Sequence, residues 1–329
     1  MENTQKIWAV KKSLLDAEVV SVVFDGVRWN PRDIDIVVAC GGGSSMDFAK
    51  AVAAMMTNRG SIQDIMKPNK VKNQPLPLIC IPTTAGTGSE VTSFAVLTVA
   101  SEGRKSSIFD EKIRPTVAID DPMLLKTLPT RIAAATGMDA LTHAIEAYTR
   151  RLANPLTDGI ALQAIRYISG CIREFVYERS DESCYKMMAG SLLAGIAFGF
   201  SDIAGVHCMA EALGGVYDTP HGVANAIFLP IVFSYNMSAD IKRHRDVAES
   251  LGVSIHGRDD KEIARLGAIW LSNLSEELKI PKLRHLKYVT EDSFEKLADL
   301  CMKNVSLKSN IRSLTREEFL ALYYQAYLP

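Results

Sequence analysis

The stretch IDIVVACGGGSSMD, residues 34–47, decides the fold. Its first seven residues are mostly apolar and rich in β-branched side chains, which predicts a strand. Three glycines follow, and residues 44–57 have the composition of a helix. Glycines at such a turn let a phosphate approach the helix N-terminus, which Ser44 can cap. A tight turn without a ligand remains the alternative, since three glycines are not the full dinucleotide fingerprint.

Further strands are expected on both sides of this stretch, at residues 19–24, 76–81 and 116–119. Helical segments separate these short apolar runs, which predicts a parallel sheet covered on both faces. From Thr130 onward no strand is convincing, and helical spacing is found at 132–149, 158–175, 184–200 and in the tail, where Ser313 is expected to start the last helix. We therefore expect an α/β domain at residues 1–128 and an all-helical domain at 129–329.

The composition excludes several classes of protein. The 329 residues are 47% hydrophobic and 23% charged, and the formal net charge is -1. There is no basic excess for nucleic acid or an acidic membrane, and apolar stretches are interrupted before the roughly 20 residues of a membrane span. The first residues do not form a signal peptide, and six scattered cysteines without a CxxC pair predict reduced thiols. A cytoplasmic location is therefore expected.

A second loop, PTTAGTGSEVT at residues 82–92, also leaves the end of a predicted strand. Loops at the carboxyl ends of parallel strands line the ligand site of an α/β sheet. The hydroxyls and small residues of this loop suit contacts with phosphate and ribose. The alternative is a polar surface loop.

Four residues of the second half form a candidate metal site. Asp139 and His143 lie four residues apart in the helical segment GMDALTHA, so both project from one face. His207 has small and apolar neighbours, and His221 lies in a Pro-Gly turn. One carboxylate and three imidazoles are a catalytic donor set for a divalent ion. Taken singly, a solvated Asp–His pair and a core histidine are the alternatives.

The remaining histidines lie among charges or in expected loops. They are His244, His256 and His285. We expect all of them at the surface.

At the candidate sites the sequence resembles the iron-containing (group III) alcohol dehydrogenases. The matching stretches are GGGSSMDFAK, PTTAGTGSEVT, GMDALTHAIEAY and GVHCMAEALGGVYDTPHGVANAIFLP, and the resemblance extends to the tail TREEFLALYYQAY. It implies an α/β dinucleotide-binding domain with a parallel sheet, whose first strand this chain is expected to lack. It also implies an all-helical metal-binding domain, a cleft between the domains, and a homodimer.

The resemblance also assigns roles to individual residues. The implied metal ligands are Asp139, His143, His207 and His221. The implied ion is Fe²⁺, although Zn²⁺ suits the same donors and binds more tightly. The implied contacts to NAD or NADP are Asn30, Gly42, Gly43, Ser44, Asp47, Thr83, Thr84, Thr92, Lys105 and Leu128.

The chain departs from the family pattern in three places. It lacks the strand and glycine-rich turn with which members begin, and the acidic residue that helps to select NAD over NADP. Residues 31–33 run directly into the strand at Ile34, where the family inserts a helix. Glu211 stands four residues after His207, where many members have a second histidine. We expect Glu211 to relay a proton or to form a structural pair.

The expected activity is hydride transfer between a primary alcohol, or its aldehyde, and NAD(P), with the ion as Lewis acid. Phe94 and Phe198 are expected to line the substrate pocket, which favours short or medium primary alcohols over charged polyols. One alternative is a sibling enzyme such as a glycerol dehydrogenase or a dehydroquinate synthase. Another is a metal-binding protein without catalysis, its cofactor half defective. Titration with NADH and NADPH distinguishes this last alternative from an enzyme, because a defective cofactor half would bind neither nucleotide.

Overall fold

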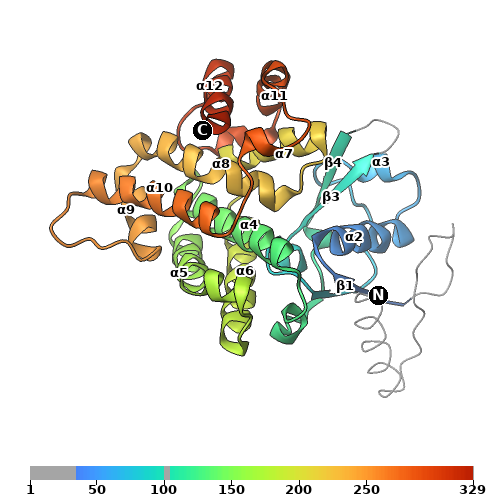
Figure 1. Cartoon of the computed structure of the whole chain (residues 1–329). Helices are drawn as coiled ribbons and strands as arrows, with labels where there is room; N and C mark the ends of the chain where they lie inside the picture. The colour runs from blue at the N-terminus through green and yellow to red at the C-terminus, as the bar shows by residue number, and fades with distance from the viewer. Residues whose placement is uncertain (1–34, 100–103, 329) are drawn as a thin grey trace.

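A computed structural model describes residues 35–99 and 104–328, in which a small sheet region is followed by a larger helical body (Figure 1). The strands are β1 (Val37–Gly41), β2 (Leu78–Pro82), β3 (Phe94–Val99), β4 (Arg104–Phe109) and β5 (Val117–Ala118). The helices are α2 (Gly43–Thr57), α3 (Ile62–Ile65), α4 (Thr130–Thr149), α5 (Pro155–Tyr177), α6 (Asp181–Gly199), α7 (Gly205–Tyr217), α8 (His221–Asn236), α9 (Ile241–Ser250), α10 (Asp260–Glu277), α11 (Phe294–Cys301) and α12 (Arg316–Tyr327). The strand expected at residues 19–24 lies outside the described residues.

The parallel sheet has the strand order β1-β2-β5, as the alternation of strands and helices predicts. Its register pairs Gly41 with Pro82, and the backbone N–H of Thr83 donates to the carbonyl oxygen of Gly41 at 2.9 Å. β1 and β2 therefore end at the same level. The two loops that follow these strands leave the sheet side by side.

The sequence did not predict the antiparallel hairpin β3–β4, which pairs Phe94 with Phe109. The two rings stack with their centroids 4.6 Å apart. The pattern was weak because β4, RKSSIF, is polar over its first four residues. Pairing with β3, rather than an apolar run of its own, makes β4 a strand.

α4 is the central helix of the helical body and packs against α5, α6 and α8 (Figure 1). Every residue from 137 to 149 is buried. A surface helix buries one stripe, whereas a helix surrounded by others is buried all round. The polar side chains of α4 therefore lie inside the protein, where each needs a hydrogen-bond partner or an ion.

Three details differ from the sequence prediction. Gly42, rather than Ser44, is the N-cap of α2. Thr315, rather than Ser313, caps α12, and it forms a capping box with Glu318. His244 is fully buried, with its Nδ1 2.7 Å from the carbonyl oxygen of Asp240.

The prediction for His244 was wrong because α9 turns one face to the core. His244, Val247 and Ala248 share that face, while the flanking Arg243 and Arg245 are part-buried and form ion pairs with carboxylates. His256 and His285 are exposed, as predicted. All six cysteines are free thiols.

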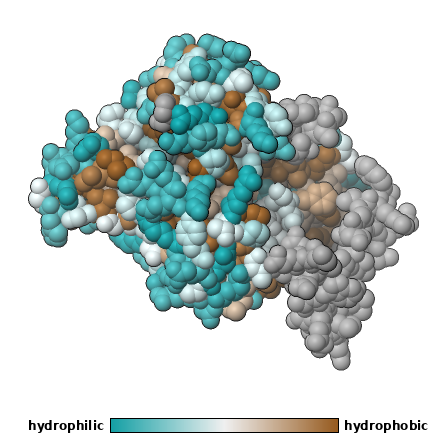
Figure 2. Space-filling model, in the orientation of Figure 1, coloured by the Kyte–Doolittle hydropathy of each residue, from teal (hydrophilic) through white to brown (hydrophobic). Residues whose placement is uncertain are grey.

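One segment, His221–Ala239, is long and apolar enough to cross a membrane by length and composition alone, although Gly222, Ser234 and Ser238 interrupt its apolar run. However, 56% of its most apolar window is buried inside the protein. The helical part of this segment, α8, packs against α4, α7 and α10, as a core helix does. On the face drawn in Figure 2, hydrophilic residues cover much of the helical body.

Candidate active site

Asp139, His143, His207 and His221 come together inside the helical body. Each offers a ligand atom, and these atoms all lie within 4.8 Å of one another. α4 supplies Asp139 and His143, α7 supplies His207 from its first turn, and α8 begins with His221. The first three are buried, whereas the His221 side chain is 36% exposed. His221 is thus the member that solvent reaches most easily.

Gly222 lets α8 begin directly against α4. A Cβ atom added at Gly222 would lie 2.2 Å from the carbonyl oxygen of Ala135 and 3.3 Å from Cβ of Asp139. Packed atoms do not approach that closely, so any side chain at this position would push the start of α8 away. The glycine therefore allows its neighbour His221 to reach the face of α4 that carries Asp139.

Asn225 lies one turn after His221 and is fully buried among the four residues. Its Nδ2 donates to Oδ1 of Asp139 at 2.7 Å and lies 3.1 Å and 3.2 Å from Nε2 of His207 and of His221. Its Oδ1 has no hydrogen-bond partner among the described residues. Three acceptor atoms thus converge on one donor, which is the arrangement that also suits a cation.

The second loop, residues 82–92, contacts this candidate metal site. The carbonyl oxygen of Gly86 lies 3.3 Å from Nδ1 of His143. Because a carbonyl only accepts, this contact places the proton of His143 on Nδ1 and leaves the Nε2 lone pair for a ligand. The Phe198 ring stacks on the other side of His143, with centroids 4.2 Å apart and planes 15° apart. His143 is held both by the loop and by α6.

The glycines after β1 lie against the hydroxyl side chains of the second loop. A Cβ atom at Gly42 would lie 3.3 Å from Oγ1 of Thr84, and one at Gly43 would lie 2.6 Å from Cγ2 of Thr87. Gly43 and Ser44 begin α2, where backbone N–H groups have no partner within the helix, and Ser44 is exposed. This corner therefore offers N–H groups and hydroxyls that suit a phosphate.

Two family models match the chain. The model of the iron-containing alcohol dehydrogenase matches residues 4–122. The model of the C-terminal part of the Fe-containing alcohol dehydrogenase family matches residues 133–327. The chain belongs to the iron-containing alcohol dehydrogenase family.

Named relatives of this iron-containing alcohol dehydrogenase act on several substrates. The chain is 39% identical to the 1,3-propanediol dehydrogenase of Citrobacter freundii, and the alignment covers 97% of the chain and 87% of the relative. It is 37% identical to the NAD-dependent methanol dehydrogenase of Bacillus methanolicus, over 90% of the chain and 78% of the relative. The solved alcohol dehydrogenase from Oenococcus oeni superposes with a TM-score of 0.93 at 34% identity, over 98% of the chain and 88% of that structure.

The family and these relatives establish the class of reaction. The protein is a metal-dependent alcohol dehydrogenase or aldehyde reductase that uses a nicotinamide cofactor. The predicted α/β region with a parallel sheet and the predicted helical body are both confirmed.

The pKa values of three residues of the candidate site are shifted, and not all in the same direction. Burial is the main influence on His143 and lowers its pKa to about 3, although Asp139 opposes this shift, so the ring is neutral and its lone pair is free. Burial disfavours the charged form of Asp139, but the three nearby histidines and the Asn225 hydrogen bond hold its pKa below the usual value. Burial is the largest influence on His207 and lowers its pKa, but the hydrogen bond and charge of Glu146, together with the charges of Asp139 and Glu211, raise the pKa overall.

Several predicted cofactor residues of the dehydrogenase have partners within the protein. Asp47 accepts from Oγ of Ser89 at 2.6 Å and from the backbone N–H of Val96 at 2.9 Å. Oγ1 of Thr92 accepts from the buried ammonium of Lys50 at 3.3 Å. Asp47 and Thr92 therefore hold the second loop and the hairpin against α2. Their contact with a cofactor stays a prediction.

The other predicted residues have different surroundings. Thr83 is buried next to Gly41, Thr84 is half-buried, and Leu128 is buried just before α4. Lys105 belongs to β4, and Asn30 lies outside the described residues.

Glu211 lies one turn after His207 on α7 but does not belong to the four-residue site. Its Oε2 accepts from Nδ2 of Asn304 at 2.6 Å. Of the two predicted pocket residues, Phe198 contacts His143, whereas Phe94 stacks on Phe109 in the hairpin. A catalytic role of Glu211 stays a prediction.

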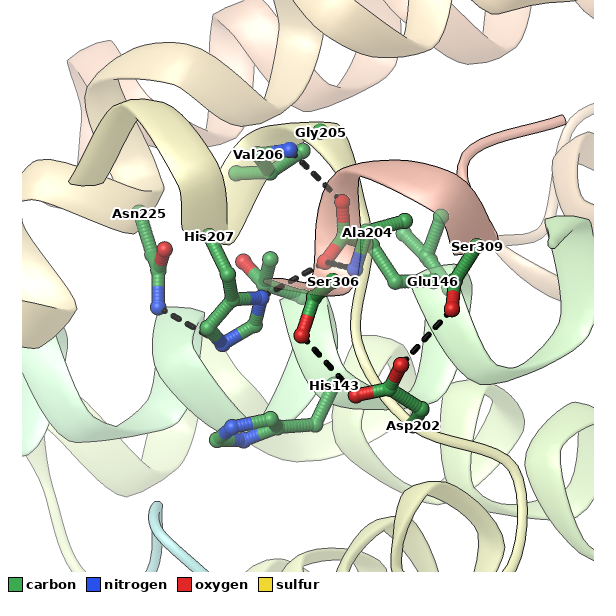
Figure 3. Close-up of polar contacts among 12 residues, drawn as sticks. His143, Glu146, Asp202, Ala204, Gly205, Val206, His207, Asn225, Ser306 and Ser309 are labelled. Atoms are coloured by element: carbon green, nitrogen blue, oxygen red, sulfur yellow. Dashed lines mark hydrogen bonds and ion pairs between the residues drawn. The ribbon is translucent and has the colours of Figure 1, made fainter. Parts of the chain in front are cut away.

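Sequence reasoning missed two residues of the site, Asn225 and Glu146. Glu146 lies behind His207, and its Oε2 is 2.6 Å from Nδ1 of that ring (Figure 3). Both had a usable signal. Glu146 follows His143 by three residues and Asn225 follows His221 by four, and either spacing places two side chains on one helix face.

Proposed function

We propose that this dehydrogenase oxidises short or medium primary alcohols, and reduces the corresponding aldehydes, at an Fe²⁺ ion held by Asp139, His143, His207 and His221. A bound divalent ion supplies Lewis-acid charge, which favours the deprotonated alcohol and polarises the aldehyde carbonyl. Zn²⁺ suits the same donors, and the choice of Fe²⁺ is supported by the family. The class of substrate is supported by the apolar Phe198 beside His143.

The observation that carries the proposal is the convergence of four donor atoms within 4.8 Å of one another. One carboxylate and three imidazoles fit a first-row divalent metal, and the set leaves a coordination position open. Burial keeps His143 neutral, so it is ready to bind without losing a proton.

The chain's own residues organise the rest of the site. Gly86 and Phe198 fix the ring of His143 from two sides, so its Nε2 faces the other ligands. Phe198 is nearly fully buried and keeps water from that side of the ring. His221, the most exposed ligand, marks the side from which a small alcohol reaches the site.

We also propose that NAD or NADP binds where the loops after β1 and β2 leave the sheet. Gly42, Gly43 and Ser44 would receive the pyrophosphate at the start of α2, and Thr83 and Thr84 would contact phosphate or ribose. The contact between Gly86 and His143 brings this end of the protein next to the metal site, which hydride transfer requires. We further propose that the protein is a homodimer and that it acts in the cytoplasm.

The test is His221→Ala, with the protein purified without oxygen and its metal measured by elemental analysis. We expect loss of bound metal and a fall in turnover of roughly a thousandfold or more, since several kcal/mol of electrostatic stabilisation disappear. NADH affinity should stay unchanged, because His221 lies on α8 and not in the nucleotide loops. Full metal content with full turnover would overturn the ligand assignment.

Reconstitution and substrate screening refine the proposal. The metal-free protein is loaded with Fe²⁺ or Zn²⁺ and assayed with a panel of alcohols and diols, using NADH and NADPH in turn. Higher activity with Zn²⁺ would contradict the choice of iron. Failure to bind either nucleotide at millimolar concentration would favour a metal-binding protein without catalysis.

A further inference from the structure

Glu146 is a buried carboxylate that the proposed chemistry does not use. It lies on α4, one turn after His143, and is 3% exposed. Figure 3 shows it between His207 and the start of α7. Its Oε2 lies 2.6 Å from Nδ1 of His207 and accepts from the backbone N–H of Ala204 at 2.8 Å, while its Oε1 accepts from the backbone N–H of Val206 at 2.7 Å.

The first consequence concerns the tautomer of His207. An ionised carboxylate only accepts hydrogen bonds, so Nδ1 of His207 carries a proton. On the opposite side of the ring, Nε2 lies 3.1 Å from Nδ2 of Asn225. That amide must present its NH₂ group, because it donates at the same time to the carboxylate of Asp139. Both neighbours therefore select the tautomer whose Nε2 lone pair faces the four-residue site.

The second consequence concerns the position of α7. Its N-cap, Ala204, has no side chain that can accept a hydrogen bond from the first turn. Glu146 accepts the N–H groups of Ala204 and Val206 instead, so a side chain of α4 caps α7. The same carboxylate thus ties the helix that carries Asp139 and His143 to the helix that carries His207.

We propose that Glu146 is the positioning residue of the metal site, holding His207 in the tautomer and place in which Nε2 binds the ion. This inference rests on the proposed function, since it concerns one of the four proposed ligands. A carboxylate behind a ligating imidazole orients the ring and makes it a stronger donor. Glu146 does this for His207 and, through the cap on α7, also fixes where that ring stands.

The test is Glu146→Gln, titrated with Co²⁺ in the absence of oxygen. Glutamine keeps the size of the side chain but offers one acceptor oxygen to a group of three N–H donors. If its NH₂ group faces His207, it favours the tautomer with the proton on Nε2, which blocks the metal. If it faces Val206, a buried N–H loses its partner and the start of α7 loosens. We expect Co²⁺ affinity to fall by roughly 10- to 100-fold, with a changed visible spectrum of the bound Co²⁺.

The matched control is Glu318→Gln. Glu318 also caps a helix, α12, where its Oε2 accepts from the backbone N–H of Thr315 at 2.8 Å, but it belongs to the capping box and not to the four-residue site. A change in thermal stability without a change in Co²⁺ affinity is expected for this control.

The outcomes separate the two proposals. Wild-type Co²⁺ affinity and spectrum in Glu146→Gln, with only a lower melting temperature, would overturn the positioning role and leave a structural cap. If the wild-type protein itself binds no Co²⁺, it is the proposed metal site that fails. Thermal melts with and without Co²⁺ give the rise in melting temperature that the ion causes. A purely structural cap would lower both melting temperatures equally and leave this rise unchanged, whereas a positioning residue would reduce it.

Discussion

The metal end and the nucleotide end of this dehydrogenase are built in opposite ways. At the metal end, side chains from α4, α7 and α8 converge, and buried partners hold each of them. At the nucleotide end, the main feature is the lack of side chains at Gly42 and Gly43, where two loops leave the sheet together. The first end depends on how helices pack. The second depends on how closely backbone and ligand can approach.

The two ends also treat buried carboxylates differently. Asp139 is buried beside three histidines and receives a hydrogen bond from Asn225. Glu90, in the second loop, is 3% exposed, and burial raises its pKa to about 7. Its own backbone N–H and the charge of Lys50 favour ionisation but do not offset burial, and Asp120 opposes it. At the metal end, burial of neutral His143 makes stability rise with pH between about 3 and 6.5, whereas Glu90 at the nucleotide end makes stability fall as the pH rises from about 4.5 to about 7.

The largest expected effect is the pH dependence that Glu90 causes. An unfolded glutamate has a pKa near 4.5, whereas folded Glu90 keeps its proton up to about pH 7. As the pH rises from about 4.5 to about 7, the unfolded state releases a proton that folded Glu90 retains, so the contribution of Glu90 to stability falls by about 3 kcal/mol and then levels off. Glu90→Gln should remove that slope and be the more stable protein at pH 8. Urea denaturation at pH 5, 6, 7 and 8 measures it.

This expectation would be wrong if the free energies of unfolding of the wild type and Glu90→Gln changed in parallel over this pH range. The slope would then come from other groups, and the contrast between the two ends in their buried carboxylates would disappear.

A smaller effect is expected from Gly222→Ala at the metal end. The added Cβ would lie 2.2 Å from the carbonyl oxygen of Ala135, so the start of α8 must shift and take His221 with it. Such overpacking costs about 1–3 kcal/mol, and metal affinity should fall by roughly tenfold or more. Competition with a chelator measures the affinity, and NADH binding should be unchanged.

Gly215→Ala is the control for that substitution. Gly215 lies in α7, which carries His207, but nothing surrounds the position that its Cβ would take. Alanine should stabilise the helix by up to about 1 kcal/mol and leave metal affinity intact. Equal losses of metal in both variants would show that any change in these helices disturbs the site.

The same contrast explains what the sequence could and could not predict. Asp139 and His143 were found because a spacing of four residues on a helix places both on one face. The turn at Gly42 and Gly43 was found because glycines between a strand and a helix have few other uses. Both signals are local, and the structure brings the predicted residues into the expected regions.

What was missed depends on contacts between distant elements. Glu146 contacts the start of α7, and its partner there, Ala204, lies 58 positions later in the chain. β4 is a strand because β3 pairs with it, and its own residues are mainly polar. His244 is buried because α9 turns that face to the core, although charged residues flank it in the sequence. For β4 and His244, no spacing within a single segment contains this information, whereas for Glu146 the three-residue spacing from His143 indicated only a shared face of α4 and not the contact with α7.

The smallest effect is expected at the nucleotide end, from Gly43→Ala. The added Cβ would lie 2.6 Å from Cγ2 and 3.1 Å from Cβ of Thr87, so either Thr87 or the start of α2 must shift at the corner where we place the pyrophosphate. NADH affinity should fall by about tenfold, or about 1.4 kcal/mol, while metal content stays at the wild-type level. Fluorescence titration with NADH measures this, and Gly159→Ala, at an open position on α5, is the control. Unchanged NADH affinity would mean that these glycines serve only the turn, and that the cofactor is held elsewhere.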